Sequence, residues 1–75
     1  MLRVVGTNVK RIRESKNLSQ GELAHIAGLQ RSYIGDVERG HRNLTLESLG
    51  LIATALEIHP GILLFENAFP QRSQI

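Results

Sequence analysis

The chain has 75 residues, of which 41% are apolar, and it carries a formal net charge of +2 at pH 7. This length predicts a single domain over residues 1–75 with a modest core, and so small a positive charge is only weak evidence for a nucleic-acid partner. The absence of cysteine excludes disulfides and thiolate sites, and without an apolar run of about 18 residues or a secretory signal we expect a cytoplasmic protein with no membrane contact.

The first predicted helix follows a lead-in of about six residues. Thr7 or Asn8 is expected to cap this helix, which should run to about Lys16. Its other face carries lysine and arginine side chains, which are expected to meet solvent or phosphate. The apolar stripe that faces the core is expected to comprise Val5, Val9 and Ile12.

A pair of short helices joined by a tight turn is predicted over about residues 19–40. Ser19 and Glu22 have the spacing of a capping box at the start of the first helix. Two helices this short bury little surface when they lie parallel. The small residues Ala24 and Gly28 are expected to let them cross closely instead, as in a helix-turn-helix.

Four segments carry a family resemblance: Ser-Gln-x-Glu-Leu-Ala from Ser19, Ala-Gly-Leu from Ala27, Arg-Ser-Tyr-Ile from Arg31 and Val-Glu-Arg-Gly from Val37. They resemble the helix-turn-helix of the phage-repressor/Cro-type DNA-binding regulators, and the resemblance covers about residues 9–64. The run Arg-Ser-Tyr-Ile with Glu-Arg-Gly-x-Arg-Asn is similar, more narrowly, to the controller proteins of restriction-modification systems.

The resemblance implies a fold and a function. The fold is all-α, a five-helix lambda-repressor-like DNA-binding domain. The function is sequence-specific transcriptional regulation by a homodimer on an inverted-repeat operator in double-stranded DNA. The narrower similarity adds restriction-modification genes as targets, and RNA polymerase is a further candidate partner.

Base contacts are expected from the exposed side of the second helix of the motif. Arg31 stands at its N-terminal end, which enters the major groove, and a guanidinium fork matches O6 and N7 of guanine. Ser32 is adjacent and can contact either kind of base. Asp36, one turn on, could accept from cytosine N4 or could instead hold Arg31 or Arg39 in place. The resemblance implies that Arg42 reaches a base edge.

Phosphate contacts are expected around the same helix. Gln20 lies at the first turn of the preceding helix, where free N–H groups and the helix dipole favour an anion. The Tyr33 hydroxyl and the loop residue Arg39 are placed to bind the DNA backbone, and the resemblance adds Asn43. The alternative is that Gln20 is an ordinary surface residue and that the loop is merely solubilising.

An ion pair between Arg13 and Glu38 is predicted on two grounds. The resemblance implies that these positions pair the first and third helices. Independently, Glu38 follows Val37 on the buried side of its helix, and a buried carboxylate needs a partner. The alternative is an exposed Glu38 near a helix C-terminus, where the helix dipole would disfavour it.

Two apolar sets follow, one facing inward and one facing outward. Thr45 is expected to cap a helix over about residues 46–56, and Pro60 begins a short further helix. The inward set is expected to comprise Leu46, Leu49, Ile52, Ala53 and Leu56. The outward set predicts a homodimer through about residues 45–66, and it comprises Leu51, Ala55, Ile58, Ile62, Leu63 and Phe65.

Other kinds of function find little support in the chain. The three histidines are 16 and 18 residues apart, which is not a metal-ligand spacing, and no phosphate loop or catalytic arrangement is recognisable. We therefore expect no enzyme activity, metal, cofactor or small-molecule substrate. Two alternatives stay open: an antitoxin-like protein-interaction module that uses residues 62–65, and an architectural DNA-binding protein without a preferred site.

Overall fold

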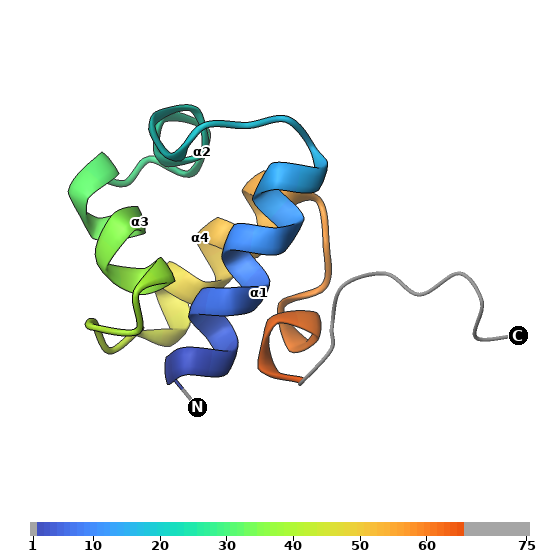
Figure 1. Cartoon of the computed structure of the whole chain (residues 1–75). Helices are drawn as coiled ribbons and strands as arrows, with labels where there is room; N and C mark the ends of the chain where they lie inside the picture. The colour runs from blue at the N-terminus through green and yellow to red at the C-terminus, as the bar shows by residue number, and fades with distance from the viewer. Residues whose placement is uncertain (1, 66–75) are drawn as a thin grey trace, which may run out of the picture.

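The computed structural model describes residues 2–65, and this part of the chain is helical without any strand (Figure 1). The helices in chain order are α1 (Leu2–Ser15), α2 (Gln20–Ala27), α3 (Arg31–Glu38), α4 (Leu46–Leu56) and the 3-10 helix η1 (Pro60–Leu64). The predicted all-α class is confirmed, with the difference that the last helix is a 3-10 helix. None of these helices is long and apolar enough to cross a membrane.

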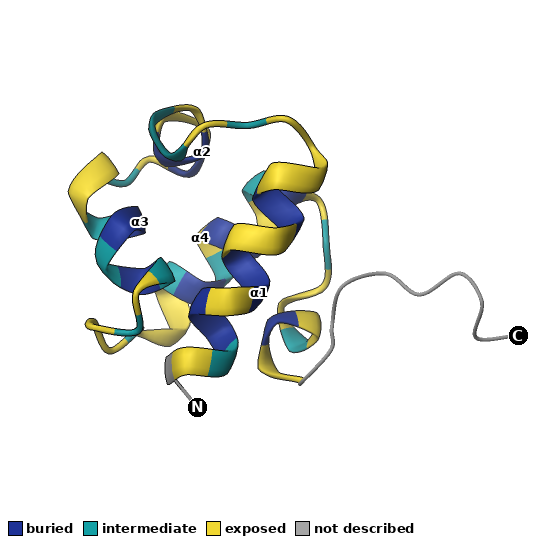
Figure 2. Cartoon of the chain, in the orientation of Figure 1, coloured by how far each residue is buried: buried dark blue, intermediate teal, exposed yellow. Residues whose placement is uncertain are grey.

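The helices pack around α1, which contacts α3, α4 and η1 (Figure 1). α2 contacts both α3 and α4, so the predicted helix-turn-helix covers one end of the molecule. Each helix buries one side and exposes the other (Figure 2). The fully buried apolar side chains are Val5, Val9, Ile12, Leu23, Ile34, Val37, Ile52, Ala53, Leu56 and Leu63.

The predicted start of the first helix is wrong. α1 begins at Leu2, so Thr7 and Asn8, which were expected to cap it, lie inside the helix. The physical reason is the burial of Val5, which is 2% exposed. Because the turn that carries Val5 packs against the core, the helical conformation is favourable before the predicted cap.

A close crossing of α1 with α3 occurs at Gly6, which the sequence analysis did not single out, and Gly28 plays no such part in the crossing predicted for α2 and α3. A Cβ atom on Gly6 would lie 2.3 Å from the carbonyl oxygen of Val37 and 2.8 Å from that of Glu38. Only glycine therefore fits where α1 meets α3. Gly28 has open space where a Cβ would be, and its φ of +74° allows it to end α2 in the left-handed conformation.

Local capping signals act as the sequence predicts. The backbone N–H of Glu22 donates to Ser19 Oγ over 2.9 Å, and the N–H of Ser19 donates to Glu22 Oε1 over 2.7 Å, which completes the capping box. Thr45 Oγ1 accepts from the N–H of Ser48 over 3.0 Å at the start of α4. Gln30 precedes α3 without a capping bond from its side chain.

Two apolar residues differ from the prediction in their burial: one expected in the core is exposed, and one expected on the surface is buried. Leu46 was assigned to the core and is 87% exposed, because it occupies the first position of α4, before the helix reaches its packed neighbours. Leu63 was assigned to a dimer surface and is 0% exposed. Its burial follows from η1 lying against both α1 and α4.

A buried asparagine that the sequence did not reveal fixes η1 to α1. Asn8 is 2% exposed, and its Nδ2 donates to the carbonyl oxygens of Leu63 over 2.9 Å and Phe65 over 2.8 Å. A buried amide requires such partners. The contact therefore determines where the end of η1 lies.

Candidate DNA-binding interface

The N-terminal end of α3 presents two polar side chains to solvent. Arg31 and Ser32 are both exposed. The aliphatic part of Arg31 lies beside Gly21 of α2, where an added Cβ would be 3.6 Å from Arg31 Cδ. Among residues 2–65, no carboxylate forms an ion pair with the Arg31 guanidinium. This guanidinium is thus available to a ligand at the predicted base-reading position.

Further along α3, one carboxylate contacts two arginines. Asp36 Oδ1 accepts a hydrogen bond from Arg39 Nη2, and Asp36 Oδ2 lies 3.6 Å from Arg42 Nη2. The Arg42 guanidinium lies over the half-buried Tyr33 ring, 5.0 Å from the ring centroid, a distance at which a cation–π interaction is favourable. Asp36 therefore contacts Arg39, as one alternative predicted, and also Arg42. A contact between Asp36 and cytosine stays a prediction.

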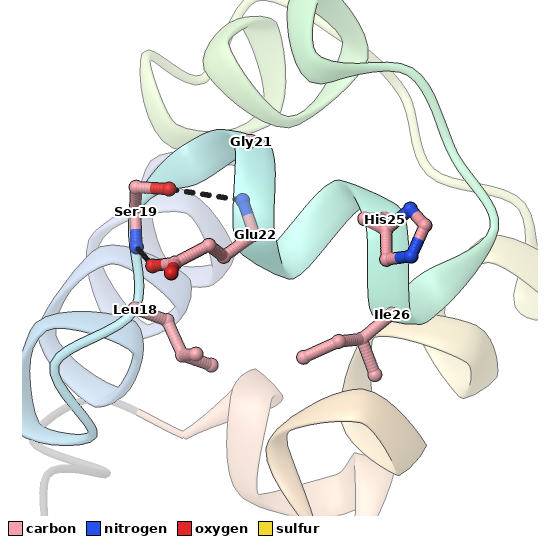
Figure 3. Close-up of a pocket in the computed structure, with 6 residues that line it drawn as sticks. All are labelled: Leu18, Ser19, Gly21, Glu22, His25 and Ile26. Carbon is pink, nitrogen blue, oxygen red and sulfur yellow. Dashed lines mark hydrogen bonds between the residues drawn. The ribbon is translucent and has the colours of Figure 1, made fainter.

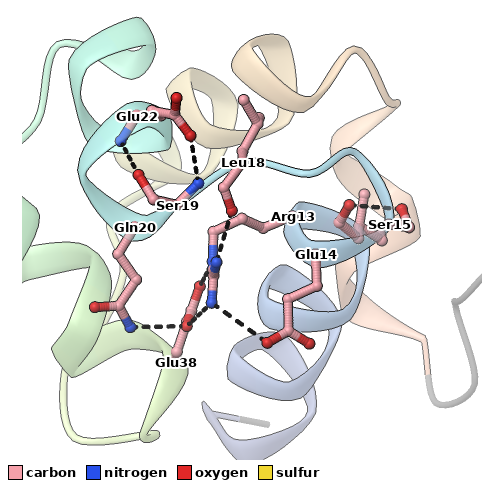
Figure 4. Close-up of polar contacts among 9 residues, drawn as sticks. Arg13, Glu14, Ser15, Leu18, Ser19, Gln20, Glu22 and Glu38 are labelled. Carbon is pink, nitrogen blue, oxygen red and sulfur yellow. Dashed lines mark hydrogen bonds and ion pairs between the residues drawn. The ribbon is translucent and has the colours of Figure 1, made fainter.

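Beneath this surface, the predicted ion pair of Arg13 and Glu38 is present (Figure 4). Arg13 Nε lies 2.6 Å from Glu38 Oε2, and Arg13 Nη2 lies 3.1 Å from Glu38 Oε1. The side chains of Arg13 and Glu38 are only 10% and 4% exposed. The hydrogen bond with Glu38 raises the pKa of the Arg13 guanidinium, while burial acts in the opposite direction.

The same network reaches α2. Arg13 Nη1 donates to the carbonyl oxygen of Leu18 over 2.7 Å, and Gln20 Nε2 donates to Glu38 Oε1 over 3.0 Å (Figure 4). Because the network joins α1, α2 and α3, it fixes the angle at which α3 is presented. Gln20 is half-buried, and among residues 2–65 the second hydrogen of its amide has no acceptor.

The loop after α3 extends the basic surface. His41, Arg42 and Asn43 are exposed, and the exposed Arg39 ends α3 just before them. With Arg31 at the other end of the helix, basic side chains stand at both ends of α3. Such a surface favours an anionic partner.

A pocket of about 440 Å³ lies beside α2 (Figure 3). Leu18 and Ile26 point toward each other across it (Figure 3). The Glu22 carboxylate that borders it is already bonded in the capping box. Within residues 2–65, no three histidine or acidic side chains are grouped so that they could hold a metal ion. The lining, which also includes His25, therefore offers an apolar contact surface between Leu18 and Ile26.

An apolar surface lies away from the basic one, on α4 and η1. Leu51 is 39% exposed, Ile62 37% and Phe65 67%. Ala55 and Ile58 are partly buried against the core and contribute less to this surface than predicted. Leu64, which lies within residues 62–65 but was not included in the predicted dimer set, is 41% exposed. The surface is smaller than the predicted one because Leu63 faces inward.

Comparison with known proteins places this geometry in a family. The helix-turn-helix family matches residues 9–63. The control protein C.SmaI from Serratia marcescens is 51% identical over 53 residues, which are 71% of this chain and 63% of that protein. The chain therefore spans less than two thirds of this relative.

Solved structures agree with the sequence match. The restriction-modification controller protein C.AhdI from Aeromonas hydrophila is 47% identical, with a TM-score of 0.80, and the match covers 85% of this chain and 96% of that one. The controller protein C.Esp1396I, solved as a tetramer in complex with its natural operator of 35 base pairs, is 40% identical with a TM-score of 0.77. That match covers 84% of this chain and 83% of C.Esp1396I.

The predicted resemblance is thereby confirmed over most of the described chain. The chain belongs to the helix-turn-helix family, and its relatives include the restriction-modification controller proteins.

Proposed function

We propose that this chain is a sequence-specific transcriptional regulator that binds an inverted-repeat operator as a homodimer. The observation that carries the proposal is the exposed Arg31 guanidinium at the N-terminal end of α3, on a helix held in place by the buried pair of Arg13 and Glu38. The N-terminal residues of the second helix are those that reach base edges in a helix-turn-helix.

The proposed DNA-contacting residues fall into two groups. Arg31, Ser32 and Arg42 contact base edges and give sequence preference, and Asp36 either accepts from cytosine N4 or acts only through the arginines that it contacts. Gln20, Tyr33, Arg39 and Asn43 contact phosphates, which position the protein without reading the sequence. The exposure of Arg31 and of Asn43 supports these roles, and the free amide hydrogen of Gln20 supports a phosphate contact.

The homodimer forms through α4 and η1 in this proposal. Support comes from the exposed apolar side chains of Leu51, Ile62 and Phe65, a set that is unfavourable in water. A two-fold dimer places the two copies of α3 about one helical turn of DNA apart, so the half-site centres should be about 34–36 Å apart.

The operator controls restriction-modification genes in this proposal. Support comes from the control protein C.SmaI and from C.AhdI, whose match covers nearly all of its chain. The operator complex of C.Esp1396I is a precedent for DNA binding by a relative. A protein with this task works in the cytoplasm, where the DNA is.

RNA polymerase is the protein partner that we propose for the DNA-bound dimer. Such a contact needs an exposed surface apart from α3 and from the dimer interface. The pocket beside α2 supplies one, with Ile26 56% exposed on its border (Figure 3). Co-purification of polymerase with operator-bound protein measures the contact, and its absence would remove polymerase from the proposed partners.

An antitoxin-like interaction module is the second candidate, because the same apolar surface could hold another protein. That function leaves the free Arg31 and the basic residues around α3 without a role. An architectural DNA-binding protein would use the basic residues, and its binding would depend on salt without a preferred site.

Arg31→Ala and Gln20→Ala should fail in different ways. Arg31→Ala is expected to flatten the preference at one base pair per half-site, worth about 1–3 kcal/mol of discrimination, while non-specific binding largely survives. Gln20→Ala is expected to weaken binding to every duplex about equally. Affinities for a set of single-base operator variants measure both effects. A uniform loss with Arg31→Ala would remove Arg31 as the base-reading residue and make Arg42 the next candidate.

A further inference from the structure

The solvent side of α3 carries one available carboxylate. The helix contains two acidic residues, Asp36 and Glu38, and the Glu38 side chain is 4% exposed and bound to Arg13. Asp36 is therefore the acidic residue of α3 that a ligand can approach from solvent. A negative charge here opposes the attraction between the basic surface and DNA phosphates, so its presence requires a reason.

Asp36 neutralises two arginines that could otherwise bind DNA. One of its oxygens accepts from Arg39 and the other lies 3.6 Å from Arg42. The side chains of Arg39 and Arg42 are 57% and 50% exposed, and that of Asp36 is 33% exposed. Ion pairs as exposed as these are weak. DNA phosphates can therefore replace the carboxylate, which is not true of the buried Glu38.

The surroundings keep both guanidinium groups close to α3. Arg42 lies over the Tyr33 ring. Arg39 Nη1 lies so near Gly35 that an added Cβ would be 3.3 Å from it. The absence of a side chain at Gly35 thus leaves room for Arg39 beside Asp36. In this arrangement the two arginines lie along the protein surface.

Resting on the function proposed above, we propose that Asp36 is a specificity-determining residue that competes with DNA for Arg39 and Arg42. On the operator, the base contacts of Arg31 hold α3 close enough for both arginines to exchange Asp36 for DNA, Arg39 at a phosphate and Arg42 at a base edge. On other sequences the base contacts of Arg31 are missing, and Arg39 and Arg42 stay paired with the Asp36 carboxylate. Binding to non-operator DNA is weak for this reason.

The test compares wild type with Asp36→Asn on an operator duplex and on a non-operator duplex of equal length, over a range of salt concentrations. Asp36→Asn should bind non-operator DNA more tightly, on the order of tenfold. The plot of log affinity against log salt should steepen by up to about 0.9 for each arginine that gains a phosphate. Operator affinity should change less, so the ratio of the two affinities should fall.

Two controls separate this role from a general effect of charge. Glu57→Gln removes an exposed carboxylate at the C-terminal end of α4 and changes the net charge equally. It should leave non-operator binding nearly unchanged. In a background of Arg39→Ala with Arg42→Ala, adding Asp36→Asn should give no further gain, because the arginines that it would release are gone.

Three results would overturn the role of Asp36 while leaving the proposed function in place. Glu57→Gln could give the same gain as Asp36→Asn, or the gain could persist without the two arginines; either result would indicate repulsion at a distance. Asp36→Asn could instead weaken only operator binding, which would make Asp36 a reader of cytosine. A wild-type protein that binds both duplexes equally would overturn the proposed function itself.

Discussion

Arg13→Ala is expected to lower the free energy of unfolding by about 3–5 kcal/mol, because it leaves a buried carboxylate without its partner. Glu38 is 4% exposed at its side chain and would keep only the hydrogen bond from Gln20. The carbonyl oxygen of Leu18 would lose its donor as well. A domain of this size is stable by only about 3–5 kcal/mol, so the variant should be largely unfolded.

The loss of stability is measured by urea denaturation, with the circular dichroism signal of the helices as the readout. Arg11→Ala is the matched control, since Arg11 is exposed on the same helix and should change stability by no more than about 0.5 kcal/mol. The double variant Arg13→Met with Glu38→Gln should be more stable than Arg13→Ala alone, because no charge stays buried. A thermal midpoint of Arg13→Ala close to that of wild type would contradict the structural role of the pair.

Ile62→Asp is expected to convert the proposed dimer into monomers and to weaken operator binding by about 10²–10⁴-fold. Ile62 lies with Leu51 and Phe65 on the proposed interface, and a dimer would have to bury the new carboxylate without a partner. The loss of affinity follows because two linked copies of α3 bind the second half-site at high effective concentration, whereas a monomer does not.

Sedimentation velocity and operator titration measure the two effects on the same samples. Ile26→Asp is the control, because Ile26 is 56% exposed and apolar but lies on α2, outside the proposed interface. It should stay dimeric. Wild-type protein that sediments as a monomer at micromolar concentration, even with operator present, would contradict the dimer.

Features that depend on neighbours in the chain could be predicted from the sequence. The capping box of Ser19 and Glu22 and the cap at Thr45 involve residues three positions apart, so their spacing suffices. The start of α1 could not be predicted this way. Thr7 and Asn8 are good capping residues, but the packing of Val5 against distant helices decided the outcome.

Features that depend on the crossing of distant segments were missed or misplaced. Nothing around Gly6 in the sequence indicates that it meets the backbone of Val37. Asn8 gives no signal that its partners are carbonyl groups more than fifty residues away. Leu46 and Leu63 are both apolar on helices with apolar neighbours, and only the packing of η1 against α1 and α4 separates the buried one from the exposed one.

For the candidate DNA-binding interface, the sequence predicted the exposure of residues that lie on the single helix α3. The exposure of Arg31 and Ser32 follows from their position at the start of α3, and the structure agrees. The pair of Arg13 and Glu38 was predictable because a carboxylate next to Val37 needs a partner. The contact of Asp36 with Arg42 depends on how the loop folds back over Tyr33, which local sequence does not determine.

Selection of DNA fragments by the purified wild-type protein tests the central claim most directly. Genomic fragments bound at physiological salt would be recovered and sequenced. The proposed function predicts that the bound fragments share an inverted repeat whose half-site centres are about 34–36 Å apart. The proposed function would be contradicted if the recovered fragments shared no sequence and their affinity depended on salt concentration alone.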